Sequence, residues 1–181
     1  NGIEFDLEDC QTEDEIIEKC KDADALLVIY RQITPKIMDA LEHCKVILRY
    51  GIGYDVIDVK AATERGIKVC NSPVQCLDEV ATHTLAMILA MERQLVFYND
   101  LVKRGQWLAN AGFKPHRLSS QTLGFVGFGH IARRAAEFAK GFGFRMIAYD
   151  PFLPEEVVKA SGAEKVERDQ LFAEADIVSL H

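Results

Sequence analysis

Six residues, Gly127 to Ala132 (GFGHIA), have the spacing G-x-G-x-x-G/A, with alanine at the third position. An apolar run (LGFV) leads into this segment, and a stretch typical of a helix (ARRAAEFAK) follows it. A second apolar run leads to Asp150, which lies 150 − 132 = 18 residues past Ala132. An aspartate or glutamate about 20 residues after such a glycine motif is typical of a ribose-binding position. Together these features predict a strand–turn–helix unit that binds a dinucleotide.

Each residue of this motif has a mechanical role. Gly127 permits the tight turn, Gly129 lets the backbone approach a pyrophosphate, and Ala132 allows close packing of helix on strand. The unpaired N–H groups at the helix start, together with the helix dipole, favour an anion. Asp150 is expected to accept hydrogen bonds from both ribose hydroxyls and to repel a 2′-phosphate, which favours NAD over NADP. The alternative is a sheet of the same kind without a nucleotide.

A second glycine-rich segment, Tyr50 to Asp55 (YGIGYD), directly follows the apolar run KVILRY. Glycines at the carboxyl end of a parallel strand leave room for a ligand. Successive backbone N–H groups in such a turn can bind a carboxylate. A plain strand-to-helix turn explains the same residues, and both interpretations stay open from this segment alone.

The elements that position these segments alternate between strands and helices, which predicts parallel sheets with crossover helices. Thr12 and Glu15 form a capping box for a helix at about 13–21, and Thr34–Pro35 and Asp58 start two further helices. The expected strands are Ile3–Phe5, 25–30 (ALLVIY, buried on both faces), 46–48, 67–70, 123–126, 145–149 and 177–180. Helices are expected at about 130–140, after Pro154 and at 168–174.

One long helix of about 27 residues is predicted from Asp78 to Arg104. Its first half, Val80 to Met91, is apolar nearly all round and is expected to be buried between two bodies of protein. The polar, turn-rich stretch 105–121 is expected to contain the domain boundary. This gives three segments: a partial domain at 1–77, an interdomain helix at 78–104, and a second, incomplete domain at 105–181. Because the chain ends on an apolar strand, we expect it to be a fragment truncated at both ends.

Composition excludes several classes of protein. The 181 residues carry a net charge of −7, and 49% are hydrophobic, which is typical of a globular protein and argues against direct nucleic-acid binding by bulk charge. The longest uncharged apolar run, Thr84 to Met91, is far shorter than the ~20 residues that span a membrane. The five cysteines form no C-x-x-C pair, and we expect buried thiols in a reducing compartment. The dispersed histidines predict no metal site.

The segments YGIGYDVID, AATERGIKVCNSP, DEVATHTLAMILA, TLGFVGFGHIA, AYDP and DIVSLH occur in this order along nearly the whole chain. In this combination the chain resembles the NAD-dependent D-isomer-specific 2-hydroxyacid dehydrogenases, above all their phosphoglycerate dehydrogenase and C-terminal-binding protein branches. The resemblance implies an α/β fold with two Rossmann/flavodoxin-like parallel-sheet domains joined by a long helix, the active site between them, and a homodimer built on the nucleotide domain. It also implies a cytoplasmic enzyme that transfers a hydride between NAD(H) and a small D-2-hydroxy acid or 2-keto acid.

The resemblance assigns expected roles to residues that match the family's segments. Ile52 and Gly53 would hold the substrate carboxylate through their backbone amides. Asn71 would lie near the substrate, although a turn residue before Pro73 explains it equally well. Thr84 would face the nicotinamide side, with a plain helix-interior threonine as the alternative. The cofactor set is completed by Gly127, Phe128, Gly129, His130, Ile131, Asp150 and His181.

The family's catalytic Arg, Glu and His are expected beyond His181, so no catalytic residue is assigned within this chain. His181 is not the catalytic histidine, and His83 is expected to be a hydrogen-bonded core residue. A structural ion pair is expected for Arg49, with a substrate contact as the alternative. The alternative function is an NAD-sensing dimeric binding protein of the C-terminal-binding protein kind, without significant turnover. A domain pair that binds no nucleotide is the third possibility.

Overall fold

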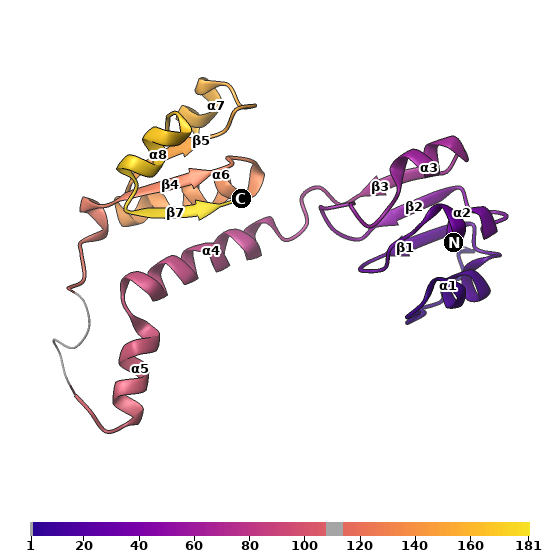
Figure 1. Ribbon diagram of the computed structural model, residues 1–181, viewed down its shortest axis with the longest axis horizontal. Coiled ribbons are helices and arrows are strands. Elements are labelled where there is room, and N and C mark those ends of the chain that lie inside the picture. The colour runs from indigo at the N-terminus through magenta and orange to yellow at the C-terminus, as the bar shows by residue number, and fades with distance from the viewer. Residues whose placement is uncertain (1, 108–113) are drawn as a thin grey trace. The chain divides into compact units, whose positions relative to one another are not determined.

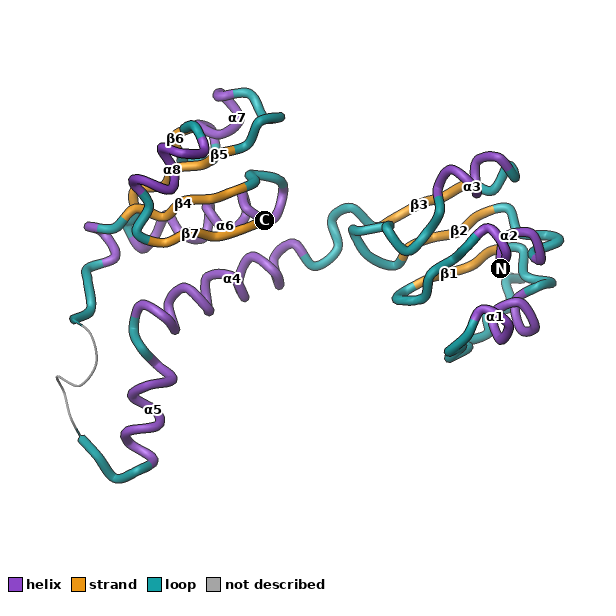
Figure 2. The backbone as a smooth tube through the Cα atoms, viewed as in Figure 1, coloured by secondary structure: helices purple, strands orange, loops and turns teal. Residues whose placement is uncertain are grey.

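The computed structural model describes residues 2–107 and 114–181 (Figure 1). It divides into two compact units, Asn1–Gln75 and Cys76–His181. Each unit contains one parallel sheet flanked by helices, as the tube in Figure 2 shows. The predicted α/β class with two parallel sheets is therefore confirmed.

The first unit is a three-stranded parallel sheet in the order β1-β2-β3. Its helices begin where the sequence predicted, because Thr12, Thr34 and Asp58 each accept a hydrogen bond from a backbone N–H of the first turn. The capping box of Thr12 and Glu15 is complete. The elements are α1 (Glu13–Cys20), β1 (Ala25–Val28), α2 (Pro35–Ala40), β2 (Val46–Arg49), α3 (Val59–Glu64) and β3 (Lys68–Asn71).

The core of this unit lies on one face of its sheet, where Val28 and Ile47 pack with apolar residues of all three helices. The neighbouring row Leu27–Leu48–Cys70 points to the opposite face, and Leu27 is 46% exposed. The prediction that ALLVIY is buried on both faces is therefore wrong, since β1 is an edge strand with one covered face. The predicted strand Ile3–Phe5 is also wrong, because these residues are exposed and pair with no described strand.

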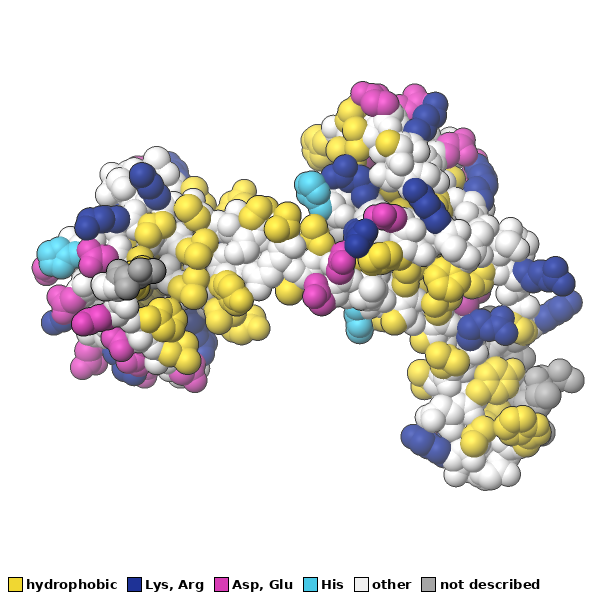
Figure 3. Space-filling view, turned by 180° about the vertical axis from the view of Figure 1, so that it is seen from behind, with side chains coloured by type: hydrophobic (Ala, Val, Ile, Leu, Met, Phe, Trp, Pro, Cys, Tyr) yellow, Lys and Arg dark blue, Asp and Glu magenta, His cyan; other side chains and the backbone are white. Residues whose placement is uncertain are grey.

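Hydrophobic and charged side chains separate on the surface of the first unit. In Figure 3 hydrophobic side chains gather on one side of this unit, and charged ones cover the opposite side. The exposed apolar residues include Ile29 and Tyr30 after β1 and Tyr50 and Tyr54 after β2. The carboxyl ends of two strands are thus rich in exposed apolar surface.

The second unit is a four-stranded parallel sheet in the order β6-β5-β4-β7. Helix α6 packs on one face through four fully buried alanines, and α8 packs on the other face through Leu171, so this sheet is doubly wound. The elements are α4 (Leu77–Glu92), α5 (Leu95–Lys103), η1 (Leu118–Ser120), β4 (Thr122–Val126), α6 (His130–Ala139), η2 (Lys140–Phe142), β5 (Arg145–Tyr149), α7 (Glu155–Ala160), β6 (Glu164–Lys165), α8 (Arg168–Glu174) and β7 (Ile177–Leu180).

The prediction of one helix from Asp78 to Arg104 is wrong. Helix α4 ends at Glu92, and Gln94 adopts a left-handed conformation with φ 51° before α5 begins. Within the second unit, Ala81, Leu85 and Ile88 pack in the core while Val80, Met87 and Met91 are exposed, and burial of this helix between two bodies of protein stays a prediction. No helix in the described part of the chain is long and apolar enough to span a membrane.

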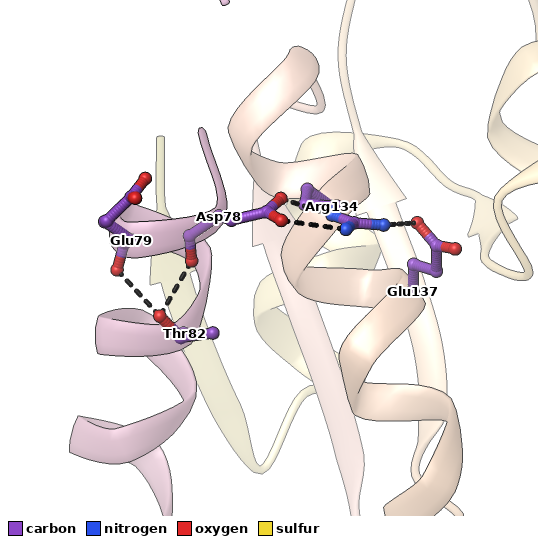
Figure 4. A network of polar contacts seen from close by, with 5 residues as sticks. All are labelled: Asp78, Glu79, Thr82, Arg134 and Glu137. Atoms are coloured by element: carbon purple, nitrogen blue, oxygen red, sulfur yellow. Dashed lines mark hydrogen bonds and ion pairs between the residues drawn. The ribbon is translucent and has the colours of Figure 1, made fainter. Parts of the chain in front are cut away.

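Helix α4 packs against α6, and this contact places the division between the units at Gln75–Cys76 instead of within 105–121. Figure 4 shows how the first turn of α4 is joined to α6. Arg134 donates from Nε to Asp78 Oδ1 over 2.6 Å and from Nη1 to Glu137 Oε2 over 2.7 Å. Its guanidinium also lies 4.3 Å from the Phe138 ring centroid. The start of α4 and the middle of α6 therefore form one connected surface.

All five cysteines are free, but only Cys10 is buried. Cys20 and Cys44 are half-buried, and Cys70 and Cys76 are exposed. The expectation of buried thiols therefore holds for one residue and is wrong for the other four.

Candidate functional site

The glycine-rich loop of the second unit connects β4 to α6. Gly127 has φ 81° and donates its N–H to Tyr149 O over 2.9 Å. A side chain on Gly127 would overlap the carbonyl oxygen of His181, which follows the neighbouring strand β7. Glycine is therefore required twice here, by the positive φ and by the close approach of a second backbone. The predicted role of Gly127 in a tight turn is confirmed.

The start of α6 offers a set of unpaired backbone donors. Gly129 is the N-cap residue, and because it has no side chain, no side-chain group accepts from the N–H groups of the first turn. Within residues 2–107 and 114–181, no acceptor is found for the N–H groups of Gly129, His130, Ile131 and Ala132. A methyl group placed on Gly129 would meet nothing within 4 Å, so open space lies against this backbone. Free donors, a helix dipole and open space fit the diphosphate of a nucleotide.

Phe128, in contrast to Gly129, is buried and its backbone N–H has an acceptor. Its ring is fully buried, 5.5 Å from the Phe125 ring centroid, and its N–H donates to Asp150 Oδ2 over 2.8 Å. Phe128 therefore anchors the loop to the core and to the end of β5. Neither its ring nor its N–H is available to a ligand, although the sequence placed it in the cofactor set.

Asp150 is almost fully buried and holds three backbone groups. Besides the N–H of Phe128, its other oxygen accepts from Phe152 N at 2.9 Å and Leu153 N at 3.2 Å. Burial raises the pKa of Asp150, but these three hydrogen bonds and the nearby Lys165 outweigh it and lower the pKa below its ordinary value. Asp150 is therefore a carboxylate at neutral pH that fixes the glycine loop and the turn after β5 together.

Thr84 and His181, the other two residues of the predicted cofactor set, make different contacts within the second unit. Thr84 lies in α4, and its hydroxyl donates to Val80 O within the same helix over 2.9 Å. His181 N donates to Val126 O, its ring lies 5.8 Å from that of Phe125, and burial lowers its pKa. His83 is exposed, so its expected place in the core is wrong. It lies on the face of α4 opposite the buried residues.

The first unit carries the second candidate site, at the turn after β2. The N–H groups of Ile52 and Gly53 find no acceptor among the residues the structure describes. Asn71, at the end of β3, donates from Nδ2 to Ile52 O over 2.8 Å, and Ser72 N donates to Gly51 O over 3.0 Å. Asn71 therefore orients the glycine turn instead of merely ending a strand. The turn that carries the two amides is thus fixed by its neighbours.

For Arg49, at the end of β2, the sequence favours a structural ion pair and leaves a substrate contact open. No carboxylate pairs with it in the described ranges, and its Nε is buried without a hydrogen-bond partner. The guanidinium lies against Gly51 and donates to Tyr50 O, beside the free amides of the turn. The signal in the sequence was its position directly before YGIGYD. Arg49 therefore places a positive charge next to the glycine turn.

Comparison with known proteins gives the family. Residues 85–181 match the model of the "D-isomer specific 2-hydroxyacid dehydrogenase, NAD binding domain". The chain belongs to the D-isomer specific 2-hydroxyacid dehydrogenase family. The glycine loop and Asp150 lie within the matched NAD-binding domain. The fold and the loop predicted from the sequence therefore agree with the family.

Similar members of this family include both curated proteins and solved structures. The chain is 40% identical to D-3-phosphoglycerate dehydrogenase of Methanocaldococcus jannaschii over 172 residues, or 94% of this chain and 33% of that protein. It is 38% identical to hydroxypyruvate reductase of Thermotoga maritima, covering 93% and 54%. The structure of D-lactate dehydrogenase from Aquifex aeolicus, complexed with NAD and lactic acid, matches with a TM-score of 0.83 and 30% identity, covering 91% and 50%. The chain thus spans a third to half of these relatives' lengths.

Proposed function

We propose that the protein containing this chain is an NAD-dependent D-2-hydroxyacid dehydrogenase. It transfers a hydride between NAD(H) and a small D-2-hydroxy acid or 2-keto acid. The observation that carries this proposal is the loop at Gly127–Ala132: four backbone N–H groups have no acceptor among the described residues, open space lies against Gly129, and the N–H of Phe128 donates to the buried carboxylate of Asp150. The named relatives, among them a D-lactate dehydrogenase complexed with NAD, support it.

In this proposal the second unit holds the cofactor. The free amides of Gly129, His130 and Ile131 receive the diphosphate, and Asp150 receives the ribose hydroxyls through lone pairs that its three backbone bonds leave free. The negative charge of Asp150 disfavours a 2′-phosphate, so NAD is preferred over NADP. The bound nicotinamide supplies the hydride chemistry.

The first unit binds the substrate carboxylate. The amides of Ile52 and Gly53 donate to its oxygens, and the Arg49 guanidinium supplies a compensating positive charge. Asn71 acts as a positioning residue, because it holds the carbonyl of Ile52 and so sets the direction of the turn. This arrangement fixes the acid end of the substrate.

We expect Arg49→Gln to raise the KM for a 2-keto acid at least ~10-fold, because a charge-assisted pair with the carboxylate is lost. The Kd for NADH is expected to stay unchanged, since the cofactor loop belongs to the other unit. Lys45→Gln is the matched control, because Lys45 precedes the same strand at its opposite end and pairs with Asp24 on the surface. Steady-state kinetics and NADH titration measure both quantities. An unchanged KM in Arg49→Gln contradicts the assigned role.

A homodimer through α5 is also part of this proposal. Helix α5 buries none of its residues within the described chain, and Leu95, Val96 and Val102 are 56%, 72% and 55% exposed. An apolar helix of this kind fits an interface between two copies better than a solvated surface. The resemblance to the family also implies a homodimer built on the nucleotide domain, the unit to which α5 belongs.

We expect Val96→Glu to shift the protein from dimer to monomer in light scattering after size-exclusion chromatography. A buried charge at an interface is costly, which is why one substitution suffices. Ile3→Glu, at a site that is 85% exposed, is expected to leave the mass unchanged. A monomeric wild type, or a dimer that persists in Val96→Glu, contradicts the assignment.

The assay of the full-length gene product tests the function itself. NADH oxidation with pyruvate, glyoxylate and hydroxypyruvate is expected, together with oxidation of D- but not L-2-hydroxy acids. NADH binding without turnover of any 2-keto acid contradicts the dehydrogenase and favours the NAD-sensing binding protein. The free cysteines fit a reducing compartment such as the cytoplasm.

A further inference from the structure

A hollow beside α6 is lined mainly by basic side chains. Its volume is about 420 Å³, which is within the range of pockets that bind small molecules. Helix α6 supplies most of the lining, and the start of α4 and the end of α7 complete it; the lining includes Leu77, His130, Arg133, Lys140 and Ser161. All of these residues belong to the second unit. The hollow is therefore formed within one compact unit.

Arg133 is held at one end of the hollow by the first turn of α6. Its Nε donates to Gly129 O over 3.4 Å, and its Nη2 lies 3.2 Å from Nδ1 of His130. Because a guanidinium can only donate, Nδ1 of His130 accepts this hydrogen bond, and the neutral imidazole then carries its N–H on Nε2. This end of the hollow therefore offers the remaining N–H groups of Arg133 and a second donor on His130.

Lys140 is held at the other end of the hollow, directly after the last residue of α6. A methyl group placed on Gly162 would lie 2.6 Å from Cε of Lys140 and 3.4 Å from its Nζ. The lysine side chain thus occupies the space that a side chain at Gly162 would need, and a glycine with φ 88° keeps this space open. Lys140 follows Arg133 by 140 − 133 = 7 residues, or about 10 Å along a helix axis.

The positive charge of Arg134, in the middle of the hollow, is balanced by two carboxylates (Figure 4). Arg134 donates to Glu137 Oε2 over 2.7 Å and to both carboxylate oxygens of Asp78. Within the described ranges 2–107 and 114–181, neither Arg133 nor Lys140 forms an ion pair. The uncompensated positive charge of the hollow therefore lies at its two ends.

We propose that this hollow is a second ligand site, for an elongated organic anion with a phosphate group at one end and a carboxylate at the other. The phosphate binds Arg133 and Nε2 of His130, because a planar guanidinium pairs with phosphate through two parallel hydrogen bonds. The carboxylate binds Lys140, and the carbon chain spans the distance of about 10 Å between the two cations. Such a ligand is neither the cofactor nor the 2-keto acid of the proposed reaction.

Calorimetric titration of the full-length gene product with 6-phosphogluconate tests the site, because this molecule carries both anionic groups on one carbon chain. We expect saturable binding to the NADH-saturated protein, with the same Kd when NADH is left out. The affinity is expected to be at least ~10-fold higher than that for glucose 6-phosphate, which lacks the carboxylate, and for gluconate, which lacks the phosphate.

Three results of this titration overturn the site: no binding of 6-phosphogluconate, equal affinity for 6-phosphogluconate and glucose 6-phosphate, or displacement of 6-phosphogluconate by NADH. The last result would assign the anion to the cofactor loop. A protein that binds 6-phosphogluconate but no NADH contradicts the dehydrogenase and leaves this site standing.

Variants locate the binding on α6. Arg133→Gln and Lys140→Gln are each expected to weaken 6-phosphogluconate binding at least ~10-fold, since each removes a charge-assisted hydrogen bond. Lys140→Gln is expected to leave the Kd for NADH unchanged, because Lys140 follows the carboxyl end of α6, away from the glycine loop. Lys159→Gln is the matched control, since Lys159 on α7 is 65% exposed and pairs with Glu155. Wild-type affinity in Lys140→Gln, or an equal loss in Lys159→Gln, overturns the assignment.

Discussion

Replacing Gly127 by alanine is expected to destabilise the second unit by at least about 2 kcal/mol and to abolish NADH binding. The residue has φ 81°, and a left-handed conformation costs a side-chain-bearing residue about 1 to 2 kcal/mol. The new methyl group would also overlap the carbonyl oxygen of His181, a backbone atom that cannot rotate away. Thermal or urea unfolding measures the first effect, and NADH fluorescence titration measures the second.

Gly129→Ala is the matched control because it separates binding from stability. Gly129 has φ −66°, and a methyl group there meets no protein atom within 4 Å. We therefore expect wild-type stability, since alanine fits the backbone and the space. We also expect NADH affinity to fall at least ~10-fold, because the methyl group occupies the side on which the diphosphate approaches. Wild-type NADH affinity in Gly129→Ala contradicts the proposed cofactor position.

Replacing Asp150 by asparagine is the second substitution with a large expected effect. The two carboxylate oxygens accept from Phe128, Phe152 and Leu153 on different sides. An asparagine offers a carbonyl to one side only, and its NH2 group then faces an N–H donor. Leaving such a buried donor unpaired costs about 1 to 3 kcal/mol, so we expect a loss of about 2 kcal/mol together with at least a ~10-fold weaker NADH affinity.

The same substitution has a pH signature. The pKa of Asp150 is lower in the folded protein than its ordinary value of 3.8, so its contribution is present above that value and is lost as the pH falls below it. Wild type should therefore lose stability below pH 3.8 more steeply than Asp150→Asn. Asp169→Asn, at a carboxylate whose side chain is 89% exposed, should match wild type in both unfolding and NADH affinity. Identical acid profiles for wild type and Asp150→Asn contradict the role.

Local patterns predicted most of the elements but not their surroundings. The strands at 145–149 and 177–180 and the caps at Thr12, Thr34 and Asp58 agree with the structure, because apolar runs and capping side chains act over a few residues. The two-residue strand β6 was missed, since Glu164 and Lys165 carry no apolar signal. The break at Gln94 was missed as well, because neither proline nor glycine marks it.

In the candidate site, too, the sequence predicted local backbone features but not the contacts that the fold creates. The motif GFGHIA predicted the loop and the unpaired backbone donors at the start of α6, since spacing alone sets those backbone groups. The hydrogen bond from Phe128 to Asp150 was not predicted, because it joins residues 22 positions apart through the fold. The lack of a carboxylate partner for Arg49 among the described residues was not predicted for a related reason, since such a partner depends on tertiary structure.

The bond between Phe128 N and Asp150 Oδ2 has a consequence for redesign of cofactor preference. A common strategy for converting an NAD enzyme to NADP is to exchange the acid after the second strand for a small or basic residue. In this protein that exchange would also release the glycine loop and the turn through Leu153. A successful conversion therefore needs a replacement acceptor for the amide of Phe128, supplied by a second substitution nearby.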